Sequence, residues 1–313
     1  GDVYKRQVDK QADELDWPDS ERESEKQKAA IRQLRGIDKD EFLAKVAKAY
    51  MALLGDGRGG VFCENSLTPR SEWGASARNE VGVGEFDVIM TNPPFGKKLK
   101  INERGTLNQY DLGHKWKKKP KSSEWERTNR VLDSQTPQIL FLERCLDLMK
   151  PGGRMGIVLP ESMLCNPSHR YIMQYLLEHA TIRAVISVHE NLFQPHTHAK
   201  TAVVLLEKGA EPEGENHDIF MAIARWCGHD SRGLAIPYDD IPLIAERWEK
   251  YVNGVELDFD HLGFVVNSSQ ITDMIYLPKY YNPEVEDSIE ALAETHELVK
   301  LGDLEEAGVI GVN

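Results

Sequence analysis

From about residue 30 onward, short apolar runs alternate with segments whose apolar residues recur at helical spacing. The runs predict strands, and the spaced segments predict amphipathic helices. The expected strands are Ile31–Ile37, Gly60–Cys63, Phe86–Met90, Met155–Leu159, Ala184–Val188 and Thr201–Leu206, and the expected helices are Asp40–Leu54, Gln138–Leu148, Ser168–His179, Ile241–Tyr251 and Glu284–Glu297. This alternation is typical of βαβ units, so we expect an α/β, doubly wound fold with a largely parallel sheet.

Three segments depart from the alternation. Lys97–Asp133 is lysine-rich with weak periodicity, which predicts a long loop. Turn residues separate the strands expected at Ala184–Val188 and Thr201–Leu206, which predicts an antiparallel hairpin at the edge of the sheet. The composition changes after Gly209, so we expect an α+β extension over residues 210–297, with a turn-rich connector at Arg232–Asp240.

The two ends differ from the central part. Residues 1–29 are polar and predict a surface helix or a disordered lead-in, and Asp2–Gln7 resembles a cloning or assembly scar. Residues 298–313 end in an apolar run that predicts the first strand of a further domain. Residues 30–209 are therefore expected to form the main domain. We expect no membrane span, because no apolar run approaches the ~18 residues that one requires.

The formal net charge of −13 is opposite to that of a typical nucleic-acid-binding domain. Any contact with nucleic acid must therefore be local. Residues 97–121 carry eight lysines and Arg104 against Glu103 and Asp111, which gives 9 − 2 = +7. This segment predicts either a phosphate-binding loop or a solvated flexible one.

The cysteine and histidine positions do not suggest a metal site. The four cysteines form no CxxC pair and lie in or beside apolar segments, which predicts reduced thiols at or near the core of a cytoplasmic protein. His196 and His198 stand two residues apart, which is not a recognised ligand spacing. We therefore expect no metal.

The motif with the clearest chemistry is Asn92-Pro93-Pro94-Phe95, which follows the strand expected at Phe86–Met90. Ligands of open α/β sheets bind beyond the carboxyl ends of the strands. The prolines fix φ and lack N–H groups, so the turn presents carbonyl oxygens. The Asn92 side-chain oxygen and the Pro93 carbonyl suit the two hydrogens of a planar amine such as adenine N6, and Phe95 suits stacking on its ring, worth ~1–3 kcal/mol. The alternative is an ordinary Asn-Pro-Pro turn.

Phe86–Gly96, which contains this motif, resembles the catalytic motif of amino-methyltransferases that act on nucleic acid. Further segments occur in the order found in the methylation subunit of type I restriction–modification enzymes: Thr136–Leu142, Leu148–Arg154, Ile157–Glu161, Ala184–Val188 and Ala199–Val203. The resemblance extends from about Ile31 to Tyr281.

This resemblance implies a class I methyltransferase fold and S-adenosylmethionine as the cofactor. It implies that Asp38 binds the ribose hydroxyls, although a lone aspartate here also suits a helix N-cap. Asn65 stands where the family has an aspartate that contacts the cofactor's adenine. The family's glycine-rich loop should precede Ile31, and Gly1–Ala30 does not supply it. We therefore expect a sheet that is incomplete at its N-terminal strand, and little activity from this chain by itself.

The implied reaction is methyl transfer to adenine N6 in duplex DNA, with Asn92 and Pro93 orienting the amine, Pro94 setting the turn and Phe95 stacking. The adenine must flip out of the helix to reach such a turn. The implied partners are specificity and restriction subunits, or a fused target-recognition domain that begins near Leu298. Two alternatives stay open: methylation of another planar amine, in protein glutamine or at N2 of ribosomal RNA guanine, and a non-catalytic assembly remnant.

Overall fold

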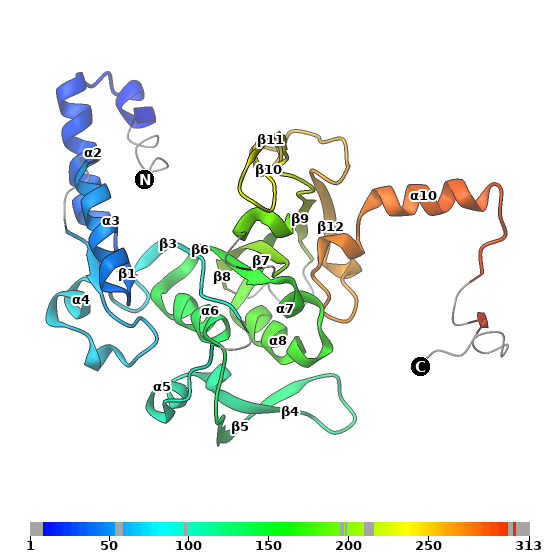
Figure 1. Cartoon of the computed structure of the whole chain (residues 1–313), viewed down its shortest axis with the longest axis horizontal. Coiled ribbons are helices and arrows are strands. Elements are labelled where there is room, and N and C mark those ends of the chain that lie inside the picture. Colours follow the sequence, from blue (N-terminus) through cyan, green and yellow to red (C-terminus); the bar gives the residue numbers. More distant parts are fainter. Residues whose placement is uncertain are drawn as a thin grey trace. The chain divides into compact units, whose positions relative to one another are not determined.

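The computed structural model describes residues 9–53, 59–96, 99–194, 197, 199–209, 216–299 and 303–304 (Figure 1). The chain divides into two compact units. The first unit comprises residues 1–89 and 93–154, and the second comprises residues 90–92 and 155–313. The divisions fall near the end of β3 (Phe86–Thr91) and inside β6 (Met149–Pro160).

The first unit begins with helices and a small parallel sheet. Residues 9–14 are helical, and α2 spans Asp19–Gln33. The strand expected at Ile31–Ile37 was wrong in its first half, because residues 31–33 complete α2 and only β1 (Gly36–Asp38) is extended. β1 pairs in parallel with β2 (Val61–Cys63), and α3 (Glu41–Leu53) connects them and packs on both. This is the βαβ unit that the sequence predicts.

The loop expected at Lys97–Asp133 was also wrong. The segment contains α5 (Arg104–Asn108), the 3-10 turn η2 (Asp111–Gly113), and an antiparallel hairpin of β4 (His114–Lys118) and β5 (Trp125–Val131). Most hairpin residues are exposed or only partly buried, so no apolar alternation marks the strands in the sequence. The remaining elements of this unit are η1 (Arg70–Glu72), α4 (Ala75–Glu80) and α6 (Pro137–Leu148).

The core of the second unit is a mixed sheet. β7 (Ala180–Val188) pairs antiparallel with β8 (Thr201–Lys208) and parallel with β9 (Asp218–Ile223), which pairs antiparallel with β12 (Phe264–Asn267). The predicted antiparallel pairing of β7 and β8 is confirmed. Its predicted place at the sheet edge is wrong, because β8 lies between β6 and β7, and β9 and β12 continue the sheet beyond β7. The residues of β7 are buried or partly buried on both faces, as suits an internal strand.

Helices and a second hairpin accompany this sheet. The helical segments are α7 (Glu161–Cys165), η3 (Pro167–His169), α8 (Arg170–His179), η4 (Glu190–Phe193), α9 (Ile241–Val252), η5 (Ser268–Gln270), η6 (Pro278–Tyr280) and α10 (Pro283–Ala293). The connector expected at Arg232–Asp240 contains a strand, β11 (Ala235–Asp239), which pairs antiparallel with β10 (Cys227–His229). Helices and strands therefore both occur after Gly209, and two of these strands, β9 and β12, belong to the larger sheet.

The strand order of the larger sheet is β12-β9-β7-β8-β6-β3, while β1 and β2 form a separate two-stranded sheet. Among the residues that the structure describes, β3 has one strand neighbour, β6, and its other edge is unpaired. Two apolar side chains of β3, Val88 and Met90, are 51% and 81% exposed. The α/β class is confirmed, but the larger sheet is mixed rather than largely parallel, and the parallel pair of β1 and β2 forms a separate sheet.

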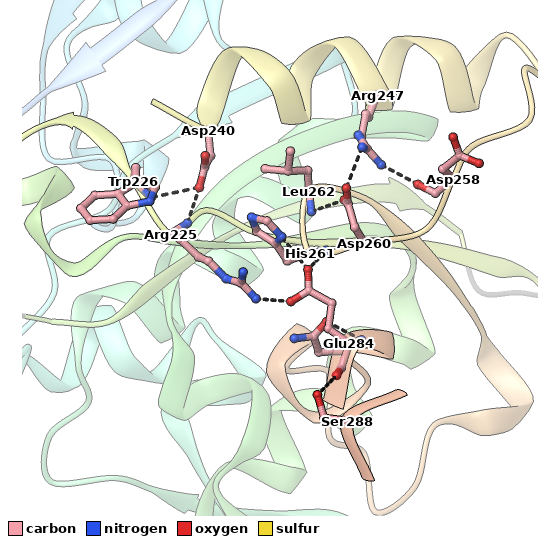
Figure 2. Close-up of polar contacts among 11 residues, drawn as sticks. Arg225, Trp226, Asp240, Arg247, Asp258, Asp260, His261, Leu262, Glu284 and Ser288 are labelled. Atoms are coloured by element: carbon pink, nitrogen blue, oxygen red, sulfur yellow. Dashed lines mark hydrogen bonds and ion pairs between the residues drawn. The ribbon is translucent and has the colours of Figure 1, made fainter. Parts of the chain in front are cut away.

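A polar network fixes the start of α10 within the second unit (Figure 2). The Glu284 carboxylate accepts a hydrogen bond from His261 Nδ1 at 2.8 Å and forms an ion pair with Arg225. Burial by itself raises the pKa of Glu284, but the hydrogen bonds from Arg225 and His261 outweigh it and lower the pKa to about 2. The ionised carboxylate is therefore the form that anchors the helix.

Two aspartates extend this network. Asp240 Oδ2 accepts the backbone N–H groups of Arg225 and Trp226 at 2.7 and 3.0 Å. Arg247 bonds Asp260 Oδ2 at 2.8 Å and the Asp258 carbonyl at 2.6 Å, as Figure 2 shows. These bonds join α9, the end of β9 and the loop before β12.

We expect Glu284→Gln to lower the melting temperature at pH 7 by roughly 2–4 °C, because the ion pair with Arg225 is lost. Glu284 has a lowered pKa in the folded state, so its contribution is complete above the unfolded pKa near 4.5 and disappears as the pH falls towards 2. The difference between wild type and variant should therefore shrink across that window in thermal unfolding followed by circular dichroism. Glu290→Gln, an exposed position on the same helix, is the control. A difference that is unchanged at pH 3 would contradict the assignment.

Candidate active site

Asp38 and Asn65 lie at the carboxyl ends of neighbouring parallel strands in the first unit. The register pairs Asp38 with Cys63, and the Glu64 N–H donates to the Asp38 carbonyl at 3.1 Å. Both predicted cofactor residues are exposed. The structure therefore brings them to one edge of the same sheet, where ligands of α/β proteins bind.

The helix N-cap alternative for Asp38 does not hold. Asp40, not Asp38, supplies the capping oxygen of α3, since its Oδ1 accepts the Leu43 N–H at 2.9 Å. Among the described residues, the Asp38 carboxylate accepts one hydrogen bond, from the Asp40 N–H to Oδ1 at 2.8 Å. A carboxylate has about four acceptor positions, so this one has capacity for a pair of hydroxyl groups.

Asn65 forms a tight turn immediately after β2. Its Oδ1 accepts the Leu67 N–H at 3.1 Å, and its carbonyl accepts the Thr68 N–H at 3.1 Å and Trp73 Nε1 at 3.0 Å. The side-chain oxygen that we expected to bond the cofactor's amino group is thus already used once, although a carbonyl oxygen can accept twice. The side-chain amide also offers donors to a ring nitrogen.

The Asn92-Pro93-Pro94-Phe95 motif follows β3 directly, as the sequence predicts. Asn92 and Pro94 are exposed, Pro93 is buried and Phe95 is half-buried. A buried proline at the second position fixes the turn, while the exposed Asn92 side chain stays accessible to a ligand. The roles assigned to these four residues stay predictions.

Two neighbouring charged residues of α6 are buried, which was not predicted from the sequence. Glu143 and Arg144 are each 5% exposed, although the pattern of α6 predicted an amphipathic helix with a polar face. The sequence does contain a signal for their burial. Apolar residues lie on all sides of this helix, which is typical of a buried helix, so its charged residues require internal partners.

Glu143 holds η2 in place. Its two carboxylate oxygens accept the N–H groups of Asp111 and Leu112 at 2.7 and 2.8 Å. Burial raises the pKa of Glu143 to about 7, while the two backbone hydrogen bonds act in the opposite direction.

The β4–β5 hairpin keeps part of its basic charge unpaired. Lys117 pairs with Glu126 and Lys119 with Glu124, at 2.9 and 2.6 Å. Three further lysines, for which the described residues give no acidic partner, are exposed: Lys115, Lys118 and Lys121. The hairpin therefore presents a small basic surface in an acidic chain.

The described part of the chain contains no cluster of histidine, cysteine, aspartate or glutamate suited to a metal ion, and no helix long and apolar enough to cross a membrane. His196 and His198 lie outside the described residues.

All four cysteines are free thiols, but the expected place of Cys63 at or near the core was wrong, because Cys63 is exposed.

The family model for N-6 DNA methylases matches residues 18–288. The chain belongs to this family. Its α/β fold is that of class I methyltransferases, and both fold and family imply the use of S-adenosylmethionine. The resemblance inferred from the motifs is confirmed.

Two curated relatives come from Escherichia coli. The type II restriction enzyme and methyltransferase RM.Eco57I is 25% identical over 63% of this chain and 19% of its own length. The methylase subunit of the type I restriction enzyme EcoEI is 24% identical over 59% of this chain and 32% of its own length. A solved structure from a type I restriction–modification system has a TM-score of 0.56 at 21% identity, covering 89% of this chain and 54% of that one. The chain spans about a fifth to a third of the length of the curated relatives it matches.

We expect Glu143→Gln to change the pH dependence of stability. The folded chain holds the Glu143 proton more tightly than the unfolded chain, so the free energy of unfolding falls as the pH rises from about 4.5 to about 7. Glutamine does not titrate, so in the variant the free energy of unfolding should decrease by up to about 3 kcal/mol less over this pH range. Urea unfolding at pH 5 and pH 8, with the exposed Glu249→Gln as the control, measures the effect. Parallel pH profiles for wild type and Glu143→Gln would show that the carboxyl is not titrating in this window.

Proposed function

We propose that the complete gene product transfers a methyl group from S-adenosylmethionine to adenine N6 in DNA, as part of a restriction–modification system. The observation that carries the proposal is the Asn-Pro-Pro-Phe turn with an exposed Asn92, directly after β3 in a chain of the N-6 DNA methylase family. The names of the matched relatives, a restriction enzyme with methyltransferase and a methylase subunit, support the biological setting.

The residues present fit part of a site for S-adenosylmethionine, whose sulfonium supplies an activated methyl group. Asp38 would accept the ribose hydroxyls, because its exposed carboxylate has acceptor capacity left. Asn65 would contact the adenine of the cofactor through its side-chain amide. The two residues lie at the ends of adjacent parallel strands, so one ligand at this edge of the sheet could contact both.

The chemistry at the target amine depends mainly on positioning. Adenine N6 is a poor nucleophile because its lone pair is delocalised into the ring. Hydrogen bonds from its two N–H groups to the Asn92 side-chain oxygen and the Pro93 carbonyl would localise that lone pair on nitrogen. Phe95 would stack on the base, and no strong general base is required, because the methylated amine loses its proton readily.

DNA is the proposed substrate because the chain combines a planar-amine turn with a basic hairpin. Lys115, Lys118 and Lys121 are exposed and suit phosphate contacts, which the net charge of −13 otherwise disfavours. A target base inside the duplex cannot reach a turn at a strand end, so the adenine would be flipped out. A specificity subunit, or a fused recognition domain, would choose the sequence that is methylated, and a restriction subunit would be a further partner.

We expect Asn92→Ala to lower the rate of methyl transfer at saturating cofactor by at least about 100-fold, because an acceptor used in the transition state is lost. The dissociation constant for S-adenosylmethionine should change little. Mass spectrometry of N6-methyladenine in duplex DNA measures the rate. Asn253→Ala, at the exposed end of α9, is the control.

The same assay separates the alternatives. Glutamine-containing peptides and ribosomal RNA fragments replace the duplex as methyl acceptors in parallel reactions. Methyl transfer to either of these acceptors, with none to DNA, would show that the turn binds a planar amine other than adenine N6. Absence of transfer to all three substrates by the complete gene product would contradict the enzymatic proposal.

A further inference from the structure

The turn that contains Asn65 is held by three side chains from outside it. Trp73 Nε1 donates to the Asn65 carbonyl at 3.0 Å. The Leu67 carbonyl accepts two further bonds, from the Tyr110 hydroxyl at 2.9 Å and from Gln109 Nε2 at 2.7 Å. Asn65 itself is exposed, so its position depends on these contacts rather than on burial of its own side chain.

Arg144 lies at the centre of these contacts. Its Nε donates to the Tyr110 hydroxyl at 2.9 Å, and its Nη2 reaches Gln109 Oε1 at 2.9 Å and the Thr68 carbonyl at 3.3 Å. The guanidinium carbon also lies 5.0 Å from the ring centre of Tyr110 and 5.9 Å from that of Trp73. One buried cation therefore contacts every side chain that holds the turn, and the turn itself.

The hydrogen bonds from Arg144 to Tyr110 and from Tyr110 to Leu67 form a chain in which each bond strengthens the next. The Tyr110 hydroxyl accepts from Arg144 and donates its own proton to Leu67, so the positive charge polarises the hydroxyl towards the turn. Lysine cannot reproduce the arrangement, because a single ammonium group lacks the planar fork of N–H donors. The geometry thus requires arginine at this position, and not only a positive charge.

The same helix also supports the base of the β4–β5 hairpin. Glu143, next to Arg144, holds the backbone of Asp111 and Leu112. Asp111 in turn binds the hairpin, because its carbonyl accepts Trp116 Nε1 at 3.0 Å and its carboxylate pairs with Arg127 at 2.7 Å. Adjacent residues of α6 therefore hold both the Asn65 turn and the hairpin.

We propose that Arg144, acting through Tyr110, is a positioning residue that fixes the Asn65 turn and joins it to the basic hairpin. The identity of the ligand, S-adenosylmethionine, rests on the proposed function, whereas the fixing of the turn does not.

The fixing of the turn is tested without any ligand. Tyr110→Phe keeps the ring but removes the hydroxyl between Arg144 and Leu67. We expect amide hydrogen exchange of Leu67 and Thr68, whose N–H groups close the turn, to become about five-fold faster. Tyr281→Phe removes a comparable hydroxyl, which donates to the Ile275 carbonyl at 2.9 Å in the second unit, and should leave both amides unchanged. Equal exchange in the two variants would overturn the positioning role.

The link to the cofactor is tested by isothermal titration of the complete gene product with S-adenosylmethionine. Arg144→Lys and Tyr110→Phe should weaken cofactor binding about five- to ten-fold, while Tyr281→Phe keeps the wild-type affinity. Unchanged affinity in Arg144→Lys and Tyr110→Phe would overturn the proposal. If the wild-type protein binds no S-adenosylmethionine, the proposed function fails, and hydrogen exchange of Leu67 and Thr68, measured for Arg144→Lys as well as for Tyr110→Phe, still decides whether these two residues fix the turn.

Discussion

A buried guanidinium is stable only when acceptors surround it, because desolvation of its charge is otherwise too costly. Arg144 meets this requirement by drawing together segments that are far apart in the sequence, residues 65–73 and 109–110. Tyr110, which accepts a hydrogen bond from Arg144, also belongs to an apolar cluster of the first unit with Leu67, Leu107 and Leu140. The precise shape of the loop after β2 is a consequence of that electrostatic constraint.

The elements with a clear apolar period were predictable from the sequence, and those organised by polar contacts were not. The apolar spacing of α3, α6 and α9 gave their positions closely, and β7 and β8 were found from their apolar runs. The β4–β5 hairpin was missed because β4 is lysine-rich, β5 is largely polar, and almost all of their residues are exposed or only partly buried, so no face is marked as buried. The internal position of β8 was missed because local patterns do not encode strand order.

The same distinction applies to the candidate site. The residues after β1, β2 and β3 were predictable, because the carboxyl ends of strands in α/β proteins are where ligands bind, and the structure leaves Asp38, Asn65 and Asn92 exposed there. The side chains that hold Asn65 were not predictable. Trp73 donates to the Asn65 carbonyl, and Tyr110 donates to the Leu67 carbonyl from a distant part of the sequence. Such bonds leave no periodic signal.

No strand in the described part of the chain pairs with the second edge of β3, and this affects how the polypeptide behaves in solution. An open strand offers a row of backbone donors and acceptors to any extended peptide, and Val88 and Met90 add apolar contact area along it. Such an edge favours self-association when no other strand covers it. Neither lysine nor proline interrupts β3 to discourage this pairing, so purification at low protein concentration, or with a covering strand supplied in trans, suits this chain.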